Sequence, residues 1–203
     1  MSLTDVPEGK LAAIVTYLEL RKKPPAAIPP SRLTLERIER PDPAAYRELF
    51  RRVGSRWLWF SRLLMSDEQL TAVIHHPEVE VFAVVDANEA VGMLELDRRV
   101  AGECELSFVG LNPESTGQGH GRWLLAEAVE RAFGGKARVD RVHVHTCTLD
   151  HPAALSAYRR AGFVATGRAV EIFIDPRLAG ILPSDCAPQI PLLSPSATSS
   201  PSS

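Results

Sequence analysis

Apolar residues gather in short runs along the middle of the chain, and turn residues separate these runs. Runs of this length with turns between them predict β-strands. The runs cover residues 33–38, 79–85, 90–96, 103–111, 141–147 and 163–174. Short turns at residues 86–88 and 101–102 join the second, third and fourth runs, so these three predict an antiparallel meander.

Four other segments repeat apolar residues at helical spacing. They cover residues 43–53, 68–75, 124–133 and 153–161. Pro77 ends the second segment, Gly134 the third and Gly162 the fourth. The resulting order is strand, two helices, three strands, helix, strand, helix and strand. This order predicts a mixed α/β sheet of about 145 residues.

The two ends of the chain differ from this middle part. Residues 22–30 read KKPPAAIPP, a Pro-rich linker, and the apolar residues 11–19 before it fit either a strand or a helix. From residue 184 onward Ser and Pro dominate, and such a segment buries too little apolar surface to offset the entropy of ordering. We therefore predict an N-terminal extension and linker (1–30), one domain (31–176) and a C-terminal tail (177–203) that is mostly disordered from about residue 184.

The composition is that of an ordinary globular chain. Of its 203 residues, 45% are hydrophobic and 24% are charged, and the net charge of -2 offers no basic field to nucleic acid or to an anionic membrane. Neither is expected as a partner. The three cysteines are widely spaced without a CxxC pair, which favours a reducing, cytoplasmic location. We find no targeting segment, and the longest apolar run, residues 11–18, is shorter than the about 20 residues that span a bilayer.

A glycine run, Gly117-Gln118-Gly119-His120-Gly121, lies between the predicted strand 103–111 and the predicted helix that follows. Such a turn leaves unpaired backbone N–H groups at the positive end of a helix dipole, which suits the phosphates of a nucleotide-like ligand. A P-loop is disfavoured because Arg122 and Trp123 stand where it needs Lys and Ser or Thr, and a dinucleotide fingerprint needs a glycine at position 122. A glycine-rich turn that only lets a helix and a strand approach each other is the structural alternative.

The segment 148–163, TLDHPAALSAYRRAGF, resembles the Asn-x-x-Ala-x-x-x-Tyr-x-x-x-Gly-Phe block of the GCN5-related N-acetyltransferase (GNAT) superfamily. The superfamily's loop pattern, Arg/Gln-x-x-Gly-x-Gly/Ala, is matched by Thr116, Gly119 and Gly121, with Thr116 in place of the usual Arg or Gln. His151 likewise replaces the usual Asn. The resemblance spans roughly residues 33–174. It implies a GNAT-like α/β fold: a mixed, mainly antiparallel sheet with splayed central strands and helices on both faces.

The resemblance implies acetyl-CoA as co-substrate, held where strands 103–111 and 141–147 splay apart. The backbone of Val109, Gly110 and Leu111 would pair with the pantetheine amides, and the Val109 N–H would be the oxyanion donor. Backbone N–H groups of the loop would bind the pyrophosphate. The residues implied in cofactor binding there are Thr116, Gly117, Gln118, Gly119, His120, Gly121 and Arg122, with His151 at the pantetheine arm or as a helix cap.

Amide formation from a thioester asks for two proton transfers, one from the amine and one to the leaving thiolate. Tyr158 matches the superfamily's general acid. A phenol with a pKa near 10 is protonated at neutral pH and would supply the thiolate with its proton. A core tyrosine whose hydroxyl reaches a backbone group is the structural alternative for Tyr158.

For the general base the resemblance favours Glu105, which precedes Gly119 by 14 residues. Glu105 would share a strand face with Ser107, Val109 and Leu111, and this apolar neighbourhood would raise its pKa toward working pH. Glu103 or a water molecule could serve instead. An ordinary solvent-facing carboxylate is the structural alternative.

Three aromatic residues, Trp57, Trp59 and Phe60, stand together between the first two predicted helices. In the superfamily this segment forms one wall of the acceptor pocket, so the three are predicted to contact the substrate through apolar or cation–π surface. Core anchoring of a loop is the alternative.

The resemblance thus predicts an N-acetyltransferase that moves an acetyl group from acetyl-CoA to a primary amine of a small molecule or protein by direct transfer. The alternative is a non-catalytic acyl-CoA-binding or sensing module. His143, His145 and Cys147 alternate on one strand face but lack a carboxylate or second cysteine at ligand spacing, so no metal is predicted. The protein is expected to be a monomer or a homodimer.

Overall fold

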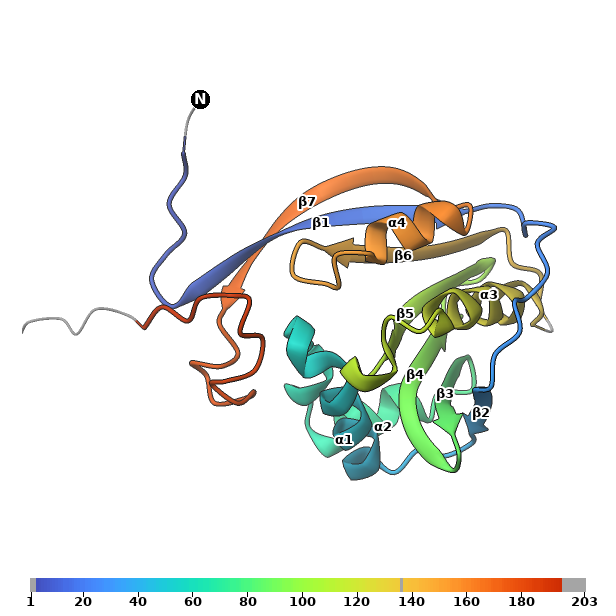
Figure 1. Ribbon diagram of the computed structural model, residues 1–203, viewed down its shortest axis with the longest axis horizontal. Helices are drawn as coiled ribbons and strands as arrows, with labels where there is room; N and C mark the ends of the chain where they lie inside the picture. Colours follow the sequence, from blue (N-terminus) through green and yellow to red (C-terminus); the bar gives the residue numbers. More distant parts are fainter. Residues whose placement is uncertain (1–2, 136, 195–203) are drawn as a thin grey trace, which may run out of the picture.

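The computed structural model describes residues 3–135 and 137–194. In these ranges the chain forms one mixed sheet with helices on both faces (Figure 1). In spatial order the strands are β2 (Thr34–Ile38), β3 (Val79–Asp86), β4 (Glu89–Asp97), β5 (Glu103–Leu111), β6 (Arg141–Cys147), β1 (Lys10–Leu20) and β7 (Val164–Ile174). Neighbouring strands pair antiparallel, except that β5 and β6 are parallel. The predicted fold class is confirmed.

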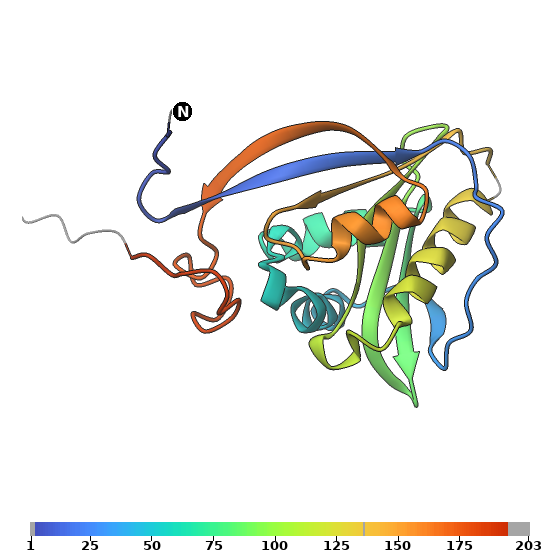
Figure 2. The same ribbon diagram turned by 45° about the horizontal axis from the view of Figure 1, so that its top comes forward.

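Two pairs of helices cover the sheet (Figure 2). One face carries α1 (Pro43–Gly54) and α2 (Asp67–Ile74), which pack around the buried Phe50, and the other carries α3 (His120–Phe133) and α4 (Ala154–Arg160), which pack around Leu106. Three short 3₁₀ turns are η1 (Ser55–Trp57), η2 (Ser61–Leu63) and η3 (Pro113–Ser115). Among the helices of the described ranges, none has the length and apolar character needed to cross a membrane.

Local capping residues explain where the first two helices begin. Before α1, the Asp42 carboxylate accepts a hydrogen bond from the Ala45 N–H at 2.9 Å, and Pro43 occupies the first turn, where its missing N–H costs nothing. Before α2, Ser66 and Gln69 form a reciprocal capping box. These short-range signals are visible in the sequence, which is why both helices lie where periodicity predicts them.

The N-terminal apolar segment forms the strand β1 and not a helix. It lies between β6 and β7, with Leu18 opposite Val144 on one side and Ile14 opposite Val170 on the other. The predicted extension 1–30 therefore contributes a strand to the same sheet as the predicted domain. Its Pro-rich part connects β1 to β2 by passing outside α3 (Figure 2).

Residues 175–194 fold back against η1 and the residue that follows it. Leu182 and Ala187 are buried against Leu58. Arg177, itself buried, pairs with Asp175 at 2.7 Å and donates to several backbone carbonyls between residues 186 and 191. Residues 184–194 therefore make defined contacts, and residues 195–203 of the predicted tail lie outside the described residues.

The sheet opens along the line between β5 and β6. Their parallel pairing covers Glu103, Cys104 and Glu105 of β5, opposite residues 141–143 of β6. Beyond Glu105 the two strands are no longer paired, although both continue for several residues. This divergence is the splay that the resemblance implies.

Candidate active site

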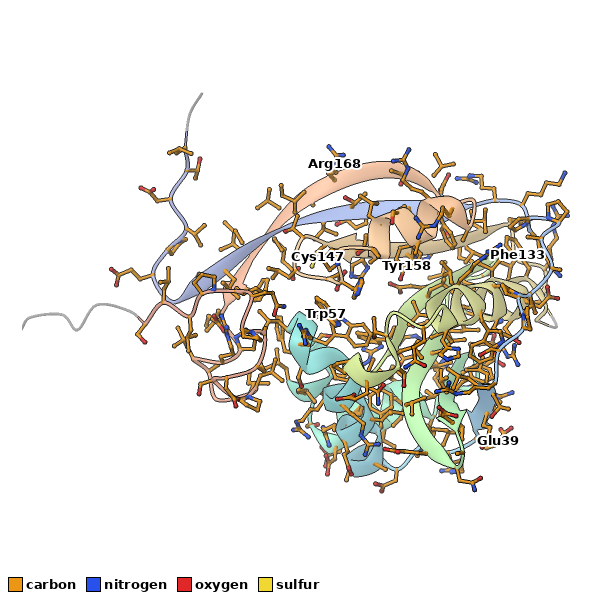
Figure 3. All side chains as sticks on the ribbon, viewed as in Figure 1. Glu39, Trp57, Phe133, Cys147, Tyr158 and Arg168 are labelled. Atoms are coloured by element: carbon orange, nitrogen blue, oxygen red, sulfur yellow. The ribbon has the colours of Figure 1, made fainter. Side chains whose placement is uncertain are left out.

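A cavity of about 1060 Å³ occupies the place where β5 and β6 separate. Residues from both faces of the sheet line it, because the gap between the strands connects the two faces. Figure 3 shows Trp57 across this gap from Cys147 and Tyr158. The walls come from the second half of β5, the glycine loop, α3, α4, the segment 57–61, the end of β6 and β7.

A β-bulge interrupts β5 beside the cavity. Glu95 of β4 pairs with Phe108, but the next residue, Leu96, pairs with Leu106, so Ser107 is an extra residue. The bulge moves every later side chain of β5 to the opposite face. Leu106 and Val109 consequently pack in the same cluster on the α3 side, whereas Phe108 packs on the α1 side.

This bulge overturns one expectation about Glu105. Glu105 lies between Cys104 and Leu106, which both pack on the α3 side, so its own side chain points to the α1 side. Val109 and Leu111 were expected on its face, but they belong to the α3 side. The expectation assumed a regular strand, and the extra residue Ser107 removes that regularity.

The second half of β5 offers unpaired backbone groups to the cavity. Val109, Gly110 and Leu111 all line it, and the pairing of β5 with β6 has ended before them. An extended ligand can add to such an edge as a further strand. The position predicted for the pantetheine is therefore open on this side.

The glycine loop has a geometry that only glycine adopts easily. Gly117 and Gly119 have φ values of 83° and 85°, in the left-handed region. Gly119 caps α3 without a side-chain hydrogen bond, so the N–H groups of the first turn keep no side-chain acceptor. Thr116, Gly117, Gly119, Gly121 and Arg122 line the cavity.

The remaining loop side chains turn away from the cavity. Gln118 donates from its amide to the Glu114 carbonyl at 3.0 Å, and the Thr116 hydroxyl donates to the Asn112 carbonyl at 2.9 Å. His120 Nδ1 lies 3.1 Å from the Ser31 hydroxyl. Neither Gln118 nor His120 is part of the cavity wall, so any contribution they make to a ligand comes from the backbone.

Tyr158 on α4 lines the cavity opposite the glycine loop. Its ring packs edge-on against Phe163 at 5.7 Å, and only 9% of the residue is exposed. Burial, and after it the nearby Asp150 carboxylate, raise the pKa of the Tyr158 hydroxyl. The phenol is therefore protonated throughout the neutral range.

The two predicted catalytic groups lie on opposite faces of the sheet. Tyr158 packs on the α3 side, and Glu105 points to the α1 side and does not line the cavity. Its carboxylate lies 3.8 Å from Nδ1 of His145, which does line the cavity. Glu103 pairs instead with Arg141 at 2.6 Å, and this pairing lowers the pKa of Glu103.

The aromatic wall, defined here as Trp57, Trp59 and Phe60, lines the cavity on the α1 side. Each member touches a residue from across the gap. Trp57 meets His151 edge-on at 5.0 Å, and Phe60 stacks on Phe173 of β7 at 5.0 Å. The Trp59 indole N–H donates to the Asp150 carboxylate at 3.4 Å. The wall thus closes the cavity between distant parts of the chain.

Buried contacts hold the segment that carries the aromatic wall. After the wall, Arg62 donates to the fully buried Glu95 of β4 at 2.5 Å, and the Tyr46 hydroxyl donates to the same carboxylate at 2.6 Å. Before the wall, Gln189 donates from its amide to the Arg56 carbonyl at 2.7 Å. These contacts come from β4, α1 and the C-terminal segment, so the wall is positioned by tertiary structure.

Asp150 is a cavity residue that the sequence reading missed as a site residue. One of its oxygens accepts from the Thr146 hydroxyl at 2.7 Å and the Cys147 N–H at 2.8 Å, and the other accepts from Trp59. The neighbouring His151 accepts from the Ala153 N–H at 3.0 Å, but Ala153 is itself the N-cap residue of α4 and no side chain caps this helix, so the predicted cap by His151 is not formed. Nothing in the local sequence separates Asp150 from an ordinary turn residue.

The Pro-rich linker forms a further wall that sequence reasoning did not predict. Lys23, Pro24, Ala26, Ala27 and Pro29 line the cavity beside α3 and α4. The Lys23 ammonium donates to Glu130 of α3 at 2.6 Å. The linker is therefore a part of the ligand-facing surface as well as a connection.

The histidines of β6 face the carboxylates of β5 and not a metal centre. His143 lies 3.5 Å from Glu103, and His145 lies 3.8 Å from Glu105. Across residues 3–135 and 137–194, no group of three or more His, Cys, Asp or Glu side chains is arranged to hold a metal ion.

Comparison with protein families gives one match. The model described as "Acetyltransferase (GNAT) family" matches residues 36–163. No curated protein matches the chain.

Comparison with solved structures gives a shared fold at low identity. A GCN5-related N-acetyltransferase from Sphaerobacter thermophilus is 19% identical with a TM-score of 0.58, over 83% of this chain and 52% of that one. A putative GNAT acetyltransferase from Novosphingobium aromaticivorans is 14% identical with a TM-score of 0.55, over 83% and 68%. An aminoglycoside acetyltransferase from a soil metagenome, in complex with sisomicin, is 19% identical with a TM-score of 0.53, over 70% and 94%. The chain spans about half the length of the Sphaerobacter protein.

Proposed function

The chain belongs to the acetyltransferase (GNAT) family, and from this premise we propose that it transfers an acetyl group from acetyl-CoA directly to a primary amine. The observation that carries the proposal is the meeting of three features in one cavity: the uncapped start of α3, the unpaired edge of β5 and the buried Tyr158. The first suits a diphosphate, the second suits the pantetheine amides and the third suits a leaving thiolate.

The glycine loop fits a diphosphate in shape as well as in charge. No atom lies within 4 Å of the positions that a Cβ would take at Gly117, Gly119 and Gly121. The backbone donors therefore stand at an open surface that a side chain would fill. Because the Thr116 hydroxyl is bonded inside the loop, these donors and the Arg122 side chain would bind the phosphates without the usual Arg or Gln.

Acetyl-CoA supplies a thioester whose carbonyl carbon the amine attacks. The Val109 N–H, beside the bulge, would donate to the carbonyl oxygen as negative charge develops there. Tyr158 would give its proton to the sulfur as the carbon–sulfur bond breaks. The phenol keeps its proton at neutral pH, so it is a donor and not an anion when the thiolate departs.

The attacking amine must lose a proton as well. A lysine-type amine has a pKa of about 10.4, so reaching its neutral form at pH 7 costs about 4.6 kcal/mol. We assign the base role to Glu105 acting through His145: His145 lines the cavity, and the Glu105 carboxylate lies 3.8 Å from its ring nitrogen. The imidazole would take the amine proton while the carboxylate orients the ring and stabilises its charged form.

The test is to incubate the purified protein with acetyl-CoA and a panel of amines, and to detect acetylated amine by mass spectrometry. Product detection is preferable to a thiol reagent, because Cys147 lines the cavity. Saturable product formation supports the proposal. Absence of any affinity for CoA in calorimetry would overturn it.

A non-catalytic acyl-CoA-binding module is the second candidate. It is favoured by the Thr116 hydroxyl being engaged within the loop and by Glu105 lying outside the cavity wall. Calorimetric acetyl-CoA binding with no product from any amine would support this second function over the first.

A further inference from the structure

The charges that line the cavity are divided between its walls. The cationic side chains are Arg122 on α3, Arg160 on α4 and Lys23 on the linker, and Lys23 is paired with Glu130 of α3, which also lines the cavity. The walls near the aromatic residues carry two carboxylates instead, Asp150 and Glu171. CoA is polyanionic, so the cationic walls suit it. The carboxylates need a different ligand.

Asp150 is held rigidly where the aromatic wall meets β6. Its three hydrogen-bond donors, the Thr146 hydroxyl, the Cys147 N–H and the Trp59 indole, come from two separate segments. Burial raises the pKa of the Tyr158 hydroxyl, and the Asp150 carboxylate is the second cause of this shift. The carboxylate therefore lies close to the group proposed to protonate the leaving sulfur.

Glu171 approaches the same place from β7. Its strand neighbour on β1 is the buried Ala13, and Glu171 itself lines the cavity. Burial first, then the Asp150 carboxylate and more weakly Glu171, raise the pKa of the Cys147 thiol. Both carboxylates line the same cavity as Cys147.

Neither carboxylate has a cation of the protein beside it. Within residues 3–135 and 137–194, no lysine, arginine or histidine lies within ion-pair distance of Asp150 or Glu171. Two carboxylates in a cavity with largely apolar walls repel each other unless a cation lies between them. The rings of Trp57 and Trp59 add a second surface that attracts a cation, and the Arg56 guanidinium already lies 5.9 Å from the centre of the Trp57 ring.

We propose that Asp150, Glu171 and the aromatic wall bind the second ammonium group and the carbon chain of a diamine acceptor. This inference rests on the proposed function. The reacting amine becomes neutral before it attacks, so it cannot remain the counter-ion of these carboxylates through the reaction. A second ammonium on the same molecule stays charged throughout. The rings of Trp57, Trp59 and Phe60 would cover the methylene groups between the two nitrogens.

The test compares acceptors that differ only in the second charge. The probes are 1,4-diaminobutane with 1-aminobutane, and 1,6-diaminohexane with 1-aminohexane. For wild type we expect kcat/KM to be about 10- to 100-fold higher for a diamine than for its matched monoamine, which corresponds to one charge-assisted hydrogen bond. Equal kcat/KM values within each pair would overturn the inference.

Glu171→Gln removes one carboxylate from an exposed strand residue and is expected to fold. It should raise KM for the diamines about 10-fold and leave KM for the monoamines and the affinity for CoA unchanged. Asp150→Asn should act in the same direction, although it also disturbs the Trp59 contact. The matched control is Glu89→Gln, an exposed carboxylate outside the cavity, which should change nothing.

The outcomes separate this inference from the proposed function. If monoamines and diamines are acetylated equally well, and Glu171→Gln changes neither, the protein is an acetyltransferase without the proposed diamine subsite. No product from any amine overturns the acetyltransferase itself. If Glu171→Gln lowers kcat/KM equally for monoamines and diamines, Glu171 has a general structural role and the proposed subsite is contradicted.

Discussion

The two sides of the cavity are built by different means. On the proposed cofactor side, the atoms that would face the ligand are backbone groups of β5 and the glycine loop. On the proposed acceptor side, they are side chains of the aromatic wall, Asp150 and Glu171, which come from three separate segments of the chain. A ligand shared by all members of a family can be bound by one fixed backbone shape. Specificity for a particular acceptor depends on side chains, which can differ from one member to the next.

The difference also decides what a mutation does. A change in the backbone shape of the loop should alter cofactor affinity and leave acceptor selection as it is. A change near the aromatic wall should do the reverse. Tyr158 lies between the two sides, so its loss should affect turnover and neither affinity.

Tyr158→Phe should have the largest effect. We expect kcat to fall by about 10² to 10⁴, because the leaving thiolate loses its proton donor. CoA affinity by calorimetry and KM for the acceptor should stay within about twofold of wild type. Tyr17→Phe, at a half-exposed position on β1, is the matched control. An unchanged kcat in Tyr158→Phe would show that Tyr158 is a core tyrosine and not the proton donor.

Glu105→Gln should lower kcat by a smaller factor, about 10- to 100-fold, because Glu105 acts through His145. His145→Gln should lower kcat at least as much, and the double variant should be no worse than His145→Gln alone. Kinetics of the three variants over a pH series will check this. Additive losses would contradict a joint role.

Gly119→Ala should weaken CoA binding about 10-fold. Its φ of 85° is costly for alanine, by about 1–2 kcal/mol, so the loop would relax away from the phosphate position. Calorimetry measures the affinity. Gly180→Ala is the control, since Gly180 has a φ of 69° in the C-terminal segment, and it should reduce thermal stability without changing CoA affinity.

Gly54→Ala should act on the acceptor side alone. A Cβ at Gly54 would lie 2.5 Å from atoms of Trp59, so the indole must move and lose its contact with Asp150. We expect KM for the acceptor to rise about 3- to 10-fold with CoA affinity retained. Gly167→Ala, whose Cβ would make an ordinary 3.7 Å contact with Tyr17, should leave KM unchanged.

Cys104→Ala should have the smallest effect on the site, because Cys104 lies on the paired part of β5 and outside the cavity wall. Burial raises the pKa of this thiol to about 12. The folded state then keeps a proton that the unfolded state loses above about pH 8.5. The free energy of unfolding of the wild type should therefore fall as the pH rises from about 9 to 11. Over this range it should fall by about 2–3 kcal/mol more than the free energy of unfolding of Cys104→Ala. Urea unfolding at several pH values will measure the difference.

The contrast between the two sides also explains what the sequence could predict. Helices and strands lie close to their predicted ranges, because periodicity, caps and turn glycines act over a few residues. The glycine loop could be predicted for the same reason, since its residues are neighbours in the sequence. Tyr158 and the aromatic wall reached the cavity wall as predicted, through the resemblance to a known family, while their roles stay predictions.

Three features could not be predicted because they depend on partners far away in the chain. One extra residue in β5 reverses which side chains share a face, and only the pairing with β4 reveals it. The segment 11–19 could become a strand only between β6 and β7, which follow it by more than a hundred residues. Asp150 is held by the nearby Thr146 and Cys147, but nothing next to it in the sequence indicates its contact with the distant Trp59.

The position of β1 has a consequence for the order of events on the ribosome. This strand precedes the other strands of the sheet in the chain, and both of its partners, β6 and β7, follow it by more than a hundred residues. Until they emerge, its apolar residues have no neighbours in the sheet, and closing such long loops is slow. In the nascent chain the β1 segment therefore stays unpaired until β6 and β7 are synthesised, and during this time it is exposed to aggregation or to binding by a chaperone.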